Sequence, residues 1–171
     1  KKKLTDEGMF DESRKRRVPD TPVRIALVAS VESAAYADFV KILSARWPFV
    51  ELHVFDTQVQ GEAAPEQLVR AITKANEQSD LCDVLVVTRG GGSADDLSAF
   101  NDERVVRAVS ASRIPSVVAI GHEIDESLAE LAADLRASTP SNAAELLVPD
   151  RSAEQATLRA LRDSLNSSAR S

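Results

Sequence analysis

Four short apolar runs alternate with longer segments of helical periodicity, and this alternation restricts the possible folds more than any other feature of the chain. The runs occupy residues 23–29, 50–55, 84–87 and 116–120. The segments between them repeat apolar residues at spacings of three and four, which is typical of amphipathic helices. Strands that alternate with helices pair in parallel through right-handed crossovers. The sequence therefore predicts an α/β fold, a mainly parallel sheet with helices on both faces, as in Rossmann-like proteins.

Changes of composition divide the chain into three predicted parts. Residues 1–22 are expected to form an N-terminal linker or tail that ends at Pro22. Residues 23–150 hold the α/β domain, in which Ser141 is the predicted N-cap of a short final helix. Residues 151–171 contain no glycine and no aromatic residue, and leucine recurs there at helical spacing, at Leu158, Leu161 and Leu165. We expect the start of a C-terminal, coiled-coil-like helical region that needs a partner. The alternative is a terminal helix that packs on its own domain.

The net charge of −6 is unevenly distributed along the chain. Residues 1–17 hold seven Lys or Arg and four Asp or Glu, a balance of +3, so the remainder carries −9. A body this acidic does not hold nucleic acid by electrostatics alone, because affinity for the nucleic-acid backbone depends on neutralising its phosphates. The basic run at 14–17 is interpreted as a solvated face of the linker. A nucleic-acid substrate would therefore need local basic groups or a separate binding domain.

The cysteine content and the lengths of the apolar runs bear on the cellular compartment. Cys82 has no second cysteine with which to form a disulfide, which favours a reducing compartment. The sequence shows neither a signal peptide nor an apolar run long enough to span a bilayer. We expect a cytoplasmic protein that makes no membrane contact.

The third apolar run leads into a glycine-rich turn, Thr88-Arg89-Gly90-Gly91-Gly92-Ser93. A glycine turn before a helix is typical of an anion site, because unpaired backbone N–H groups point outward there. Ser93 is a candidate N-cap, and the planar guanidinium of Arg89 suits phosphate oxygens. The turn lacks both the Gly-Lys-Ser/Thr of a P-loop and the spacing of a dinucleotide fingerprint. We predict that Arg89, Gly90, Gly91, Gly92 and Ser93 bind phosphate. The alternative is a flexible turn without a ligand.

The fourth apolar run leads into a second polar turn, Gly121-His122-Glu123-Ile124-Asp125. Because the carboxyl ends of parallel strands share one edge, where open α/β sheets bind ligands, we expect the two turns to lie side by side. Asp125 can orient or charge the imidazole of His122, three residues before it. Phosphodiester hydrolysis needs one group that activates water and one that assists the leaving oxygen, and histidine suits either task. The alternative for His122 is a cap or another structural role, which is our interpretation of His53.

An ordered series of motifs extends through nearly the whole chain. The motifs are Glu7-Gly8-Met9-Phe10-Asp11, Ala34-Ala35-x-x-Asp38, Thr88-Arg89-Gly90-Gly91-Gly92-Ser93, Asp95-Asp96-Leu97, Phe100-Asn101-Asp102-Glu103, Ile114-Pro115, Gly121-His122-Glu123-x-Asp125 and Ala133-Asp134-Leu135-Arg136-Ala137-x-Thr139-Pro140-Ser141-x-Ala143-Ala144-Glu145. Together they resemble the family of large subunits of bacterial exodeoxyribonuclease VII. The number and order of the motifs make this resemblance very specific.

The resemblance implies a nuclease that degrades single-stranded DNA from either end and releases 5′-phosphorylated products. It carries four catalytic positions over to this chain: Asp38, Arg89, His122 and Asp125. It also implies that residues 23–150 form a catalytic domain, to which the family adds an N-terminal OB-fold and a C-terminal helical region that gathers small subunits. We expect both additions to be missing here, so that this chain alone binds single-stranded DNA weakly and digests it poorly.

The chain departs from the family pattern at three places. Ile124 stands where threonine is usual, Glu130 stands where aspartate is usual, and the turn after the first apolar run lacks a glycine. These differences concern the shape of turns and not the expected chemistry.

The sequence leaves two questions open. Asp38, Asp125 and Glu123 can supply carboxylates for Mg²⁺, but their spacing is not a recognised ligand motif, so metal dependence stays undecided. The rival to a nuclease is a non-catalytic phosphate- or nucleotide-binding α/β module with a regulatory or scaffolding role. Such a module would use Arg89 and the glycines but would leave His122 and Asp125 without a task.

Overall fold

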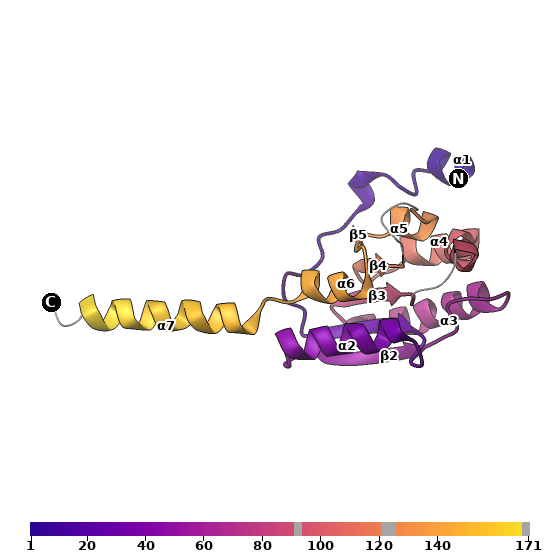
Figure 1. Ribbon diagram of the computed structural model, residues 1–171. Coiled ribbons are helices and arrows are strands. Elements are labelled where there is room, and N and C mark those ends of the chain that lie inside the picture. Colours follow the sequence, from indigo (N-terminus) through magenta and orange to yellow (C-terminus); the bar gives the residue numbers. More distant parts are fainter. Residues whose placement is uncertain (91–93, 121–125, 169–171) are drawn as a thin grey trace.

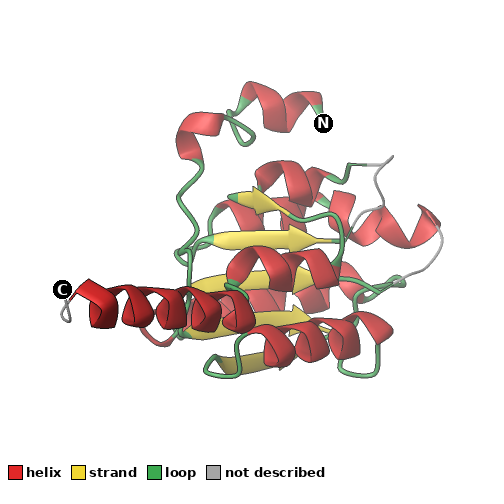
Figure 2. Cartoon of the chain, turned by 60° about the vertical axis from the view of Figure 1, so that its left-hand side comes forward, coloured by secondary structure: helices red, strands yellow, loops and turns green. Residues whose placement is uncertain are grey.

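The computed structural model describes residues 1–90, 94–120 and 126–168. Its centre is a five-stranded sheet of parallel strand pairs in the order β2-β1-β3-β4-β5 (Figures 1 and 2). The strands are β1 (Arg24–Ala29), β2 (Glu51–Asp56), β3 (Val84–Thr88), β4 (Ser116–Ala119) and β5 (Leu135–Arg136). The predicted α/β fold is confirmed, with one strand more than the apolar runs indicated. β5 has only two residues and one of them is Arg136, so no apolar run marks it.

Helices cover both faces of the sheet, as predicted (Figure 1). One face carries α2 (Ala34–Arg46) and α6 (Pro140–Leu147), and the other carries α3 (Ala64–Glu77), α4 (Glu103–Ser110) and α5 (Leu128–Ala132). Successive side chains of a strand point to opposite faces. Leu27 therefore packs with Phe39 of α2, whereas Val28 packs with Leu68 of α3. The smaller elements are α1 (Lys2–Asp6) and the 3₁₀ helices η1 (Glu12–Arg14), η2 (Ser79–Leu81) and η3 (Ala94–Asn101).

The N-cap of α6 differs from the predicted one. The Thr139 hydroxyl accepts a hydrogen bond from the backbone N–H of Asn142 at 3.0 Å, so Thr139 and not Ser141 caps the helix. Pro140 occupies the first helical position, where its missing N–H and fixed φ suit the helix start. The cap therefore lies one residue before the proline.

The strand order creates a switch point beside β1. The chain leaves β1 through α2 on one face to reach β2, and it returns through α3 on the opposite face to reach β3. The chain leaves β3 through η3 and α4 on the face opposite to α2, so the connections that leave β1 and β3 diverge above the carboxyl ends of these two strands. In open α/β sheets the ligand crevice lies at such a point, and the same rule holds for other domains with the order 2-1-3-4-5.

The N-terminal residues are held against the domain by α1. Leu4 is buried, with 3% of its surface exposed. Two ion pairs fasten α1 and the residue that follows it to α4: Lys3 with Glu103 at 2.8 Å and Glu7 with Arg107 at 2.7 Å. The position of a boundary between this segment and the domain stays a prediction.

Arg16 provides a second attachment of the N-terminal segment. Its guanidinium pairs with Asp134 at 2.7 Å and donates hydrogen bonds to the backbone carbonyls of residues 112–114, just before β4. Asp134 in turn accepts hydrogen bonds from the backbone N–H (2.7 Å) and the hydroxyl (3.0 Å) of Ser116, the first residue of β4. The interpretation of residues 14–17 as a solvated face is therefore wrong for Arg16.

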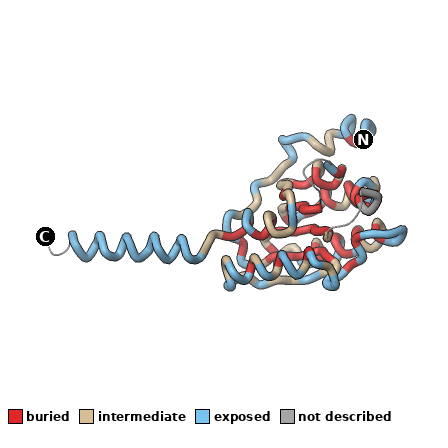
Figure 3. Tube along the Cα trace, viewed as in Figure 1, coloured by how far each residue is buried: buried red, intermediate tan, exposed pale blue. Residues whose placement is uncertain are grey.

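The last described helix, α7 (Arg151–Ser168), extends away from the domain (Figures 1 and 3). All its residues are exposed, including Leu158, Leu161 and Leu165. Its start is tied to α2 and the residues after it: Asp150 pairs with Arg46 at 3.9 Å, and the Arg151 guanidinium carbon lies 5.6 Å from the centre of the Phe49 ring. Packing of this helix on its own domain is thus wrong for the described residues, whereas a coiled-coil partner stays a prediction.

The described helices lack the combination of length and hydropathy that a bilayer requires. None of those within residues 1–90, 94–120 and 126–168 is both long and apolar enough to cross a membrane.

Candidate active site

Arg89 directly follows strand β3 and lies at the carboxyl edge of the sheet. Thr88, the last residue of the strand, is fully buried, and Arg89 keeps only 3% of its surface exposed. The backbone N–H of Arg89 donates to the carbonyl oxygen of Ala119 at the end of β4 (3.3 Å), which fixes the turn against the neighbouring strand. A guanidinium stays protonated at physiological pH, and water screens its field little when it is buried. The fold therefore places a permanent positive charge at this edge.

Gly90 brings the same turn against the start of α2. A methyl group at Gly90 would lie 3.5 Å from Cβ of Ser33 and 3.7 Å from Cβ of Ala35, so the two segments are in close approach. Ser33 is the N-cap of α2, because its hydroxyl accepts a hydrogen bond from the backbone N–H of Tyr36 at 3.2 Å. The turn after β3 and a helix N-terminus after β1 thus meet at the switch point. Both are features that favour a negatively charged ligand.

Asp38 lies on α2 close to this contact. It follows Ala35 by three residues, a spacing that places both side chains on one side of the helix. Its side chain is exposed, in contrast to the buried Arg89. The structure therefore brings Arg89 and Gly90 to the start of α2, the helix that carries Asp38, whereas the role of Asp38 stays a prediction.

The other predicted site residues lie outside the described part of the chain. These are Gly91, Gly92 and Ser93 of the first turn and His122, Glu123 and Asp125 of the second. Their roles stay predictions. His53, the other histidine, lies on the edge strand β2, with its Nε2 atom 2.9 Å from Oε1 of Glu51.

Asn101 joins the segments that follow the two turns. It is the last residue of η3, which follows the glycine turn, and its side-chain oxygen accepts a hydrogen bond from the backbone N–H of Leu128 at 2.8 Å. Leu128 is the first residue of α5, which follows the histidine turn. This bond holds the end of η3 against the start of α5. The sequence analysis did not identify Asn101 as a site residue, although an asparagine between two helical segments is a typical cap.

Arg136 holds the described residues that follow the histidine turn. Its guanidinium pairs with Glu126 at 2.7 Å and lies 3.5 Å from Oε1 of Glu130. Glu130 is buried, and its other carboxylate oxygen accepts hydrogen bonds from the backbone N–H (2.8 Å) and the hydroxyl (3.0 Å) of Ser127. The result is a capping box at the start of α5, for which a glutamate has the required reach. Arg136 itself stands at the end of β5, the strand that no apolar run predicted.

The described residues give no support for a particular metal. Within residues 1–90, 97–120 and 126–168, His, Cys, Asp and Glu side chains form no group of three or more that could hold an ion. Two of the three carboxylates considered for Mg²⁺, Asp125 and Glu123, lie outside these ranges. Metal dependence therefore stays open.

The fold and this edge define a class of protein. The chain is a parallel α/β domain whose switch point combines a buried arginine, a glycine turn and a helix N-terminus. Such a combination suits a ligand that carries phosphate or another anion, because guanidinium and backbone N–H groups both donate to its oxygens.

Comparison with known sequences identifies the family. The family model described as "Exonuclease VII, large subunit" matches residues 9–171, and the chain belongs to this family. Curated relatives named "Exodeoxyribonuclease 7 large subunit" include proteins of Hamiltonella defensa subsp. Acyrthosiphon pisum (strain 5AT) and Rhodopirellula baltica (strain DSM 10527 / NCIMB 13988 / SH1). The first is 50% identical over 151 residues (88% of this chain and 34% of the relative), and the second is 46% identical over 159 residues (93% and 36%).

The similarity extends to distant bacteria but covers only part of each relative. The protein of Streptococcus pneumoniae (strain Hungary19A-6) with the same name is 48% identical over 149 residues, which are 87% of this chain and 33% of that protein. This chain thus spans about a third of the length of the curated relatives that it matches.

Proposed function

We propose that this chain is the catalytic part of an exodeoxyribonuclease that hydrolyses phosphodiester bonds of single-stranded DNA from either end and yields 5′-phosphorylated products. The observation that carries the proposal is the turn at Arg89 and Gly90, where a buried arginine is followed by a glycine that lies against the N-terminus of α2 at the switch point. Membership of the exonuclease VII large-subunit family supports nuclease chemistry at that place.

The first turn binds the scissile phosphate in this proposal. Arg89 donates to two phosphate oxygens through its planar fork, and the backbone N–H groups of residues 90–93 complete the cradle. Negative charge on these oxygens increases as water attacks phosphorus. Donors that are already in place stabilise the transition state without reorganisation, which is the largest single contribution in many enzymes of this kind.

The second turn supplies the proton transfers. His122 acts as general base on the attacking water or as general acid toward the 3′ oxygen, and Asp125 orients its imidazole. The bond from phosphorus to the 3′ oxygen breaks, so the phosphate stays on the 5′ end of the released product. Asp38 completes the site from α2, the helix that Gly90 contacts.

The partners follow from the same proposal. Single-stranded DNA is the substrate, and exodeoxyribonuclease VII small subunits bind a helical region that α7 begins. The exposed leucines of α7 support this role, because an apolar seam at helical spacing is stabilised by packing against another helix. The compartment of such an enzyme is the cytoplasm.

Replacement of His122 by alanine tests the proposed function. We expect turnover of single-stranded DNA to fall by about 10²–10⁴-fold, the usual contribution of general acid–base catalysis, while affinity for the DNA is retained. The assay uses residues 1–171 in place of the matching segment of a full-length exonuclease VII large subunit, with small subunits supplied. His53→Ala is the matched control, because it removes a histidine on β2 that pairs with Glu51.

The outcome separates the nuclease from its rival. A non-catalytic phosphate-binding module would show no hydrolysis attributable to this chain, and His122→Ala would then be indistinguishable from His53→Ala. Equal turnover by the two variants would contradict the proposed function.

A further inference from the structure

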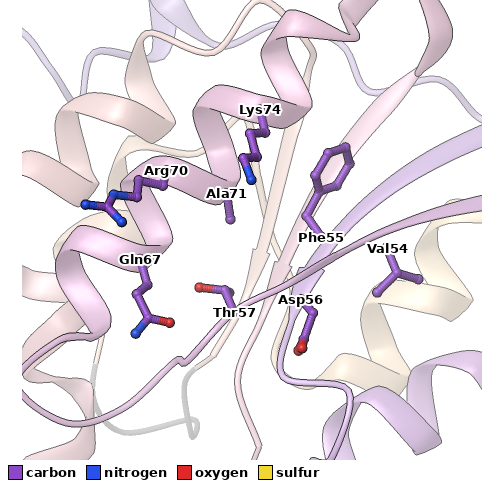
Figure 4. A pocket seen from close by; sticks show the side chains of 8 residues that line it. All are labelled: Val54, Phe55, Asp56, Thr57, Gln67, Arg70, Ala71 and Lys74. Atoms are coloured by element: carbon purple, nitrogen blue, oxygen red, sulfur yellow. The ribbon is translucent and has the colours of Figure 1, made fainter.

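A pocket of about 430 Å³ lies between the end of β2 and the helix α3 (Figure 4). Phe55 and Thr57 form its strand side, and Gln67, Arg70 and Lys74 come from the helix side. Figure 4 shows Lys74 and Gln67 directed from α3 toward the strand side. The pocket is not part of the site described above, so its ligand has to be inferred from its position and its chemistry.

The pocket opens at the same level of the sheet as Arg89. Val28 of β1 pairs with Phe55 on one side and with Val87 on the other, so Thr57 and Arg89, each two residues further on, reach the carboxyl edge at one height. A single strand, β1, separates them. Two spacings between neighbouring strands amount to about 10 Å, which is a separation within reach of neighbouring groups on one DNA strand.

The walls of the pocket are fixed by hydrogen bonds. The Gln67 side chain donates to the side-chain oxygen of Gln58 (2.9 Å) and accepts from its backbone N–H (3.2 Å). The backbone N–H of Thr57 donates to Ala29 at the end of β1 (3.0 Å), and the Thr57 hydroxyl donates to the carbonyl of Gln58 (3.3 Å). A site that is already formed loses little conformational entropy when a ligand binds.

The charges at the pocket favour an anion. Lys74 is exposed and makes no ion pair within the part of the chain that the structure describes, whereas Arg70 is paired with Glu66. The Asp56 carboxylate accepts a hydrogen bond from the backbone N–H of Val31 at 3.1 Å, and Figure 4 shows it directed away from Lys74. Lys74 therefore contributes a positive charge that forms no ion pair with the described residues, although Asp56 lines the same pocket.

The apolar part of the pocket distinguishes a nucleotide from a simple ion. Phe55 is half-buried and packs against the core on the α3 face, which leaves part of its ring to the pocket. Aromatic residues make up only 4% of this chain, and Phe55 is the one that lines the same pocket as Lys74. A ring offers a surface on which a base or sugar packs without regard to sequence.

We propose that this pocket is a second phosphate subsite for the single-stranded DNA substrate. Lys74 binds a backbone phosphate of a nucleotide next to the scissile position, and Phe55 contacts the attached sugar or base. With a net charge of −9 outside residues 1–17, the domain needs local basic groups or a separate binding domain to hold DNA, and the subsite supplies one such group beyond Arg89. The inference rests on the proposed function, because it requires the scissile phosphate to lie at Arg89.

Lys74→Gln tests the subsite, with Arg113→Gln as the matched control. Both substitutions remove one exposed positive charge, but the Arg113 side chain lies at the opposite edge of the sheet, before β4. Binding is measured by fluorescence anisotropy in the His122→Ala background, so that the probes stay intact. The probes are labelled oligothymidylate, with phosphates on both sides of the scissile position, and a dithymidylate with a single phosphodiester.

We expect Lys74→Gln to weaken oligothymidylate binding by about 3–10-fold and to lower the slope of log affinity against log salt by about 0.7, the value for one phosphate contact on a single strand. Binding of dithymidylate should not change, because its one phosphate occupies the site at Arg89. Lys74→Arg, which keeps the charge, should restore most of the affinity.

Two results would overturn the subsite. One is an equal effect of Lys74→Gln and Arg113→Gln on oligothymidylate, which would indicate a general charge effect. The other is an equal effect of Lys74→Gln on the two probes. Hydrolysis by the chain with His122 intact is measured separately: its absence, with Lys74-dependent binding retained, would reject the nuclease and not the subsite.

Discussion

The amino and carboxyl edges of the sheet are built by opposite means. At the amino edge, aspartates hold the first residues of neighbouring strands together. Asp83 accepts hydrogen bonds from the backbone N–H groups of Val23 (2.9 Å) and Arg24 (2.8 Å), and Asp134 does the same for Ser116. The carboxylates give hydrogen-bond partners to backbone N–H groups at the strand starts, among them that of the buried Ser116. This edge is also where the N-terminal segment and α7 join the domain (Figure 2).

The carboxyl edge instead concentrates a positive charge and small residues. Arg89 is buried at the end of β3, and Gly90 lies against Ser33 and Ala35. Small residues leave the backbone accessible to a ligand, and a buried cation without water around it acts strongly on that ligand. From this comparison we propose that the amino edge serves stability and the carboxyl edge serves chemistry. Substitutions at the two edges should therefore change different measured quantities.

Among the described residues of the two edges, the largest expected effect is on catalysis, from Arg89→Lys. Lysine keeps the charge but loses the planar fork, so it cannot donate to two phosphate oxygens in the same geometry. We expect turnover to fall by about 10²–10³-fold, or roughly 3–4 kcal/mol of transition-state stabilisation. Steady-state hydrolysis of single-stranded DNA by the assembled enzyme measures this. Near-normal turnover would mean that Arg89 acts only as a diffuse charge, and the contrast between the edges would fail.

A smaller effect, on stability, is expected from Arg16→Ala at the amino edge. The substitution leaves the carboxylate of Asp134, whose side chain is 6% exposed, without its ion-pair partner. The loss should be about 2–3 kcal/mol, less than for a fully buried pair because the Arg16 side chain is 37% exposed. Arg14→Ala is the control: Arg14 is exposed, and its substitution should change the free energy of unfolding by less than about 0.5 kcal/mol. Urea denaturation gives both values.

The same pair has a definite pH dependence. Burial raises the pKa of Asp134. Hydrogen bonds from Arg16 and Ser116 and the positive charge of Arg16 lower this pKa by more than burial raises it, so it lies below its ordinary value of 3.8. A carboxyl group with a lowered pKa stabilises the folded state above its unfolded pKa and loses that effect as the pH falls through its folded pKa. The difference in unfolding free energy between wild type and Arg16→Ala should therefore be complete at neutral pH and shrink below about pH 4. A difference that is constant down to pH 2 would contradict the role of Asp134.

The sequence predicted the sheet and its two helical layers but not the order of the strands in the sheet. Aliphatic runs such as residues 84–87 are buried on both faces, so they identify strands of a covered parallel sheet. The order of the strands depends on which face each helix takes, and the apolar patterns of α2 and α3 do not reveal that choice. β5 was not predicted, because it consists of only two residues, Leu135 and Arg136, and so contains no apolar run.

The site was predictable only in its chemically distinctive part. Glycines with an arginine after a strand indicate an anion site by mechanism, and the structure does bring Arg89, Gly90 and the helix of Asp38 together. Asn101 and Arg136 could not be predicted as residues that hold the site. The partner of Asn101 is distant in the sequence, and the contact of Arg136 depends on β5, which no apolar run marks. The contact of Arg16 was not predicted either, because its partner Asp134 is 118 residues away in the sequence.

The smallest of these effects is expected from Asn101, the residue that links η3 to α5, the segments that follow the two turns. Asn101→Ala removes the acceptor for the Leu128 N–H and should cost about 1 kcal/mol of stability, while Asn101→Asp keeps an oxygen at the same place and should restore most of it. A merely structural bond would change stability alone. Because this bond joins η3 to α5, the segments that follow the two turns, we expect the alanine variant also to lower kcat several-fold with little change in KM, since misplacement of catalytic groups affects the rate strongly. Asp102→Ala, which removes the cap of α4 next to Asn101, is the matched control for stability. If both alanine variants lower kcat equally at equal loss of stability, Asn101 only stabilises the fold, and the carboxyl edge would not depend on it for its geometry.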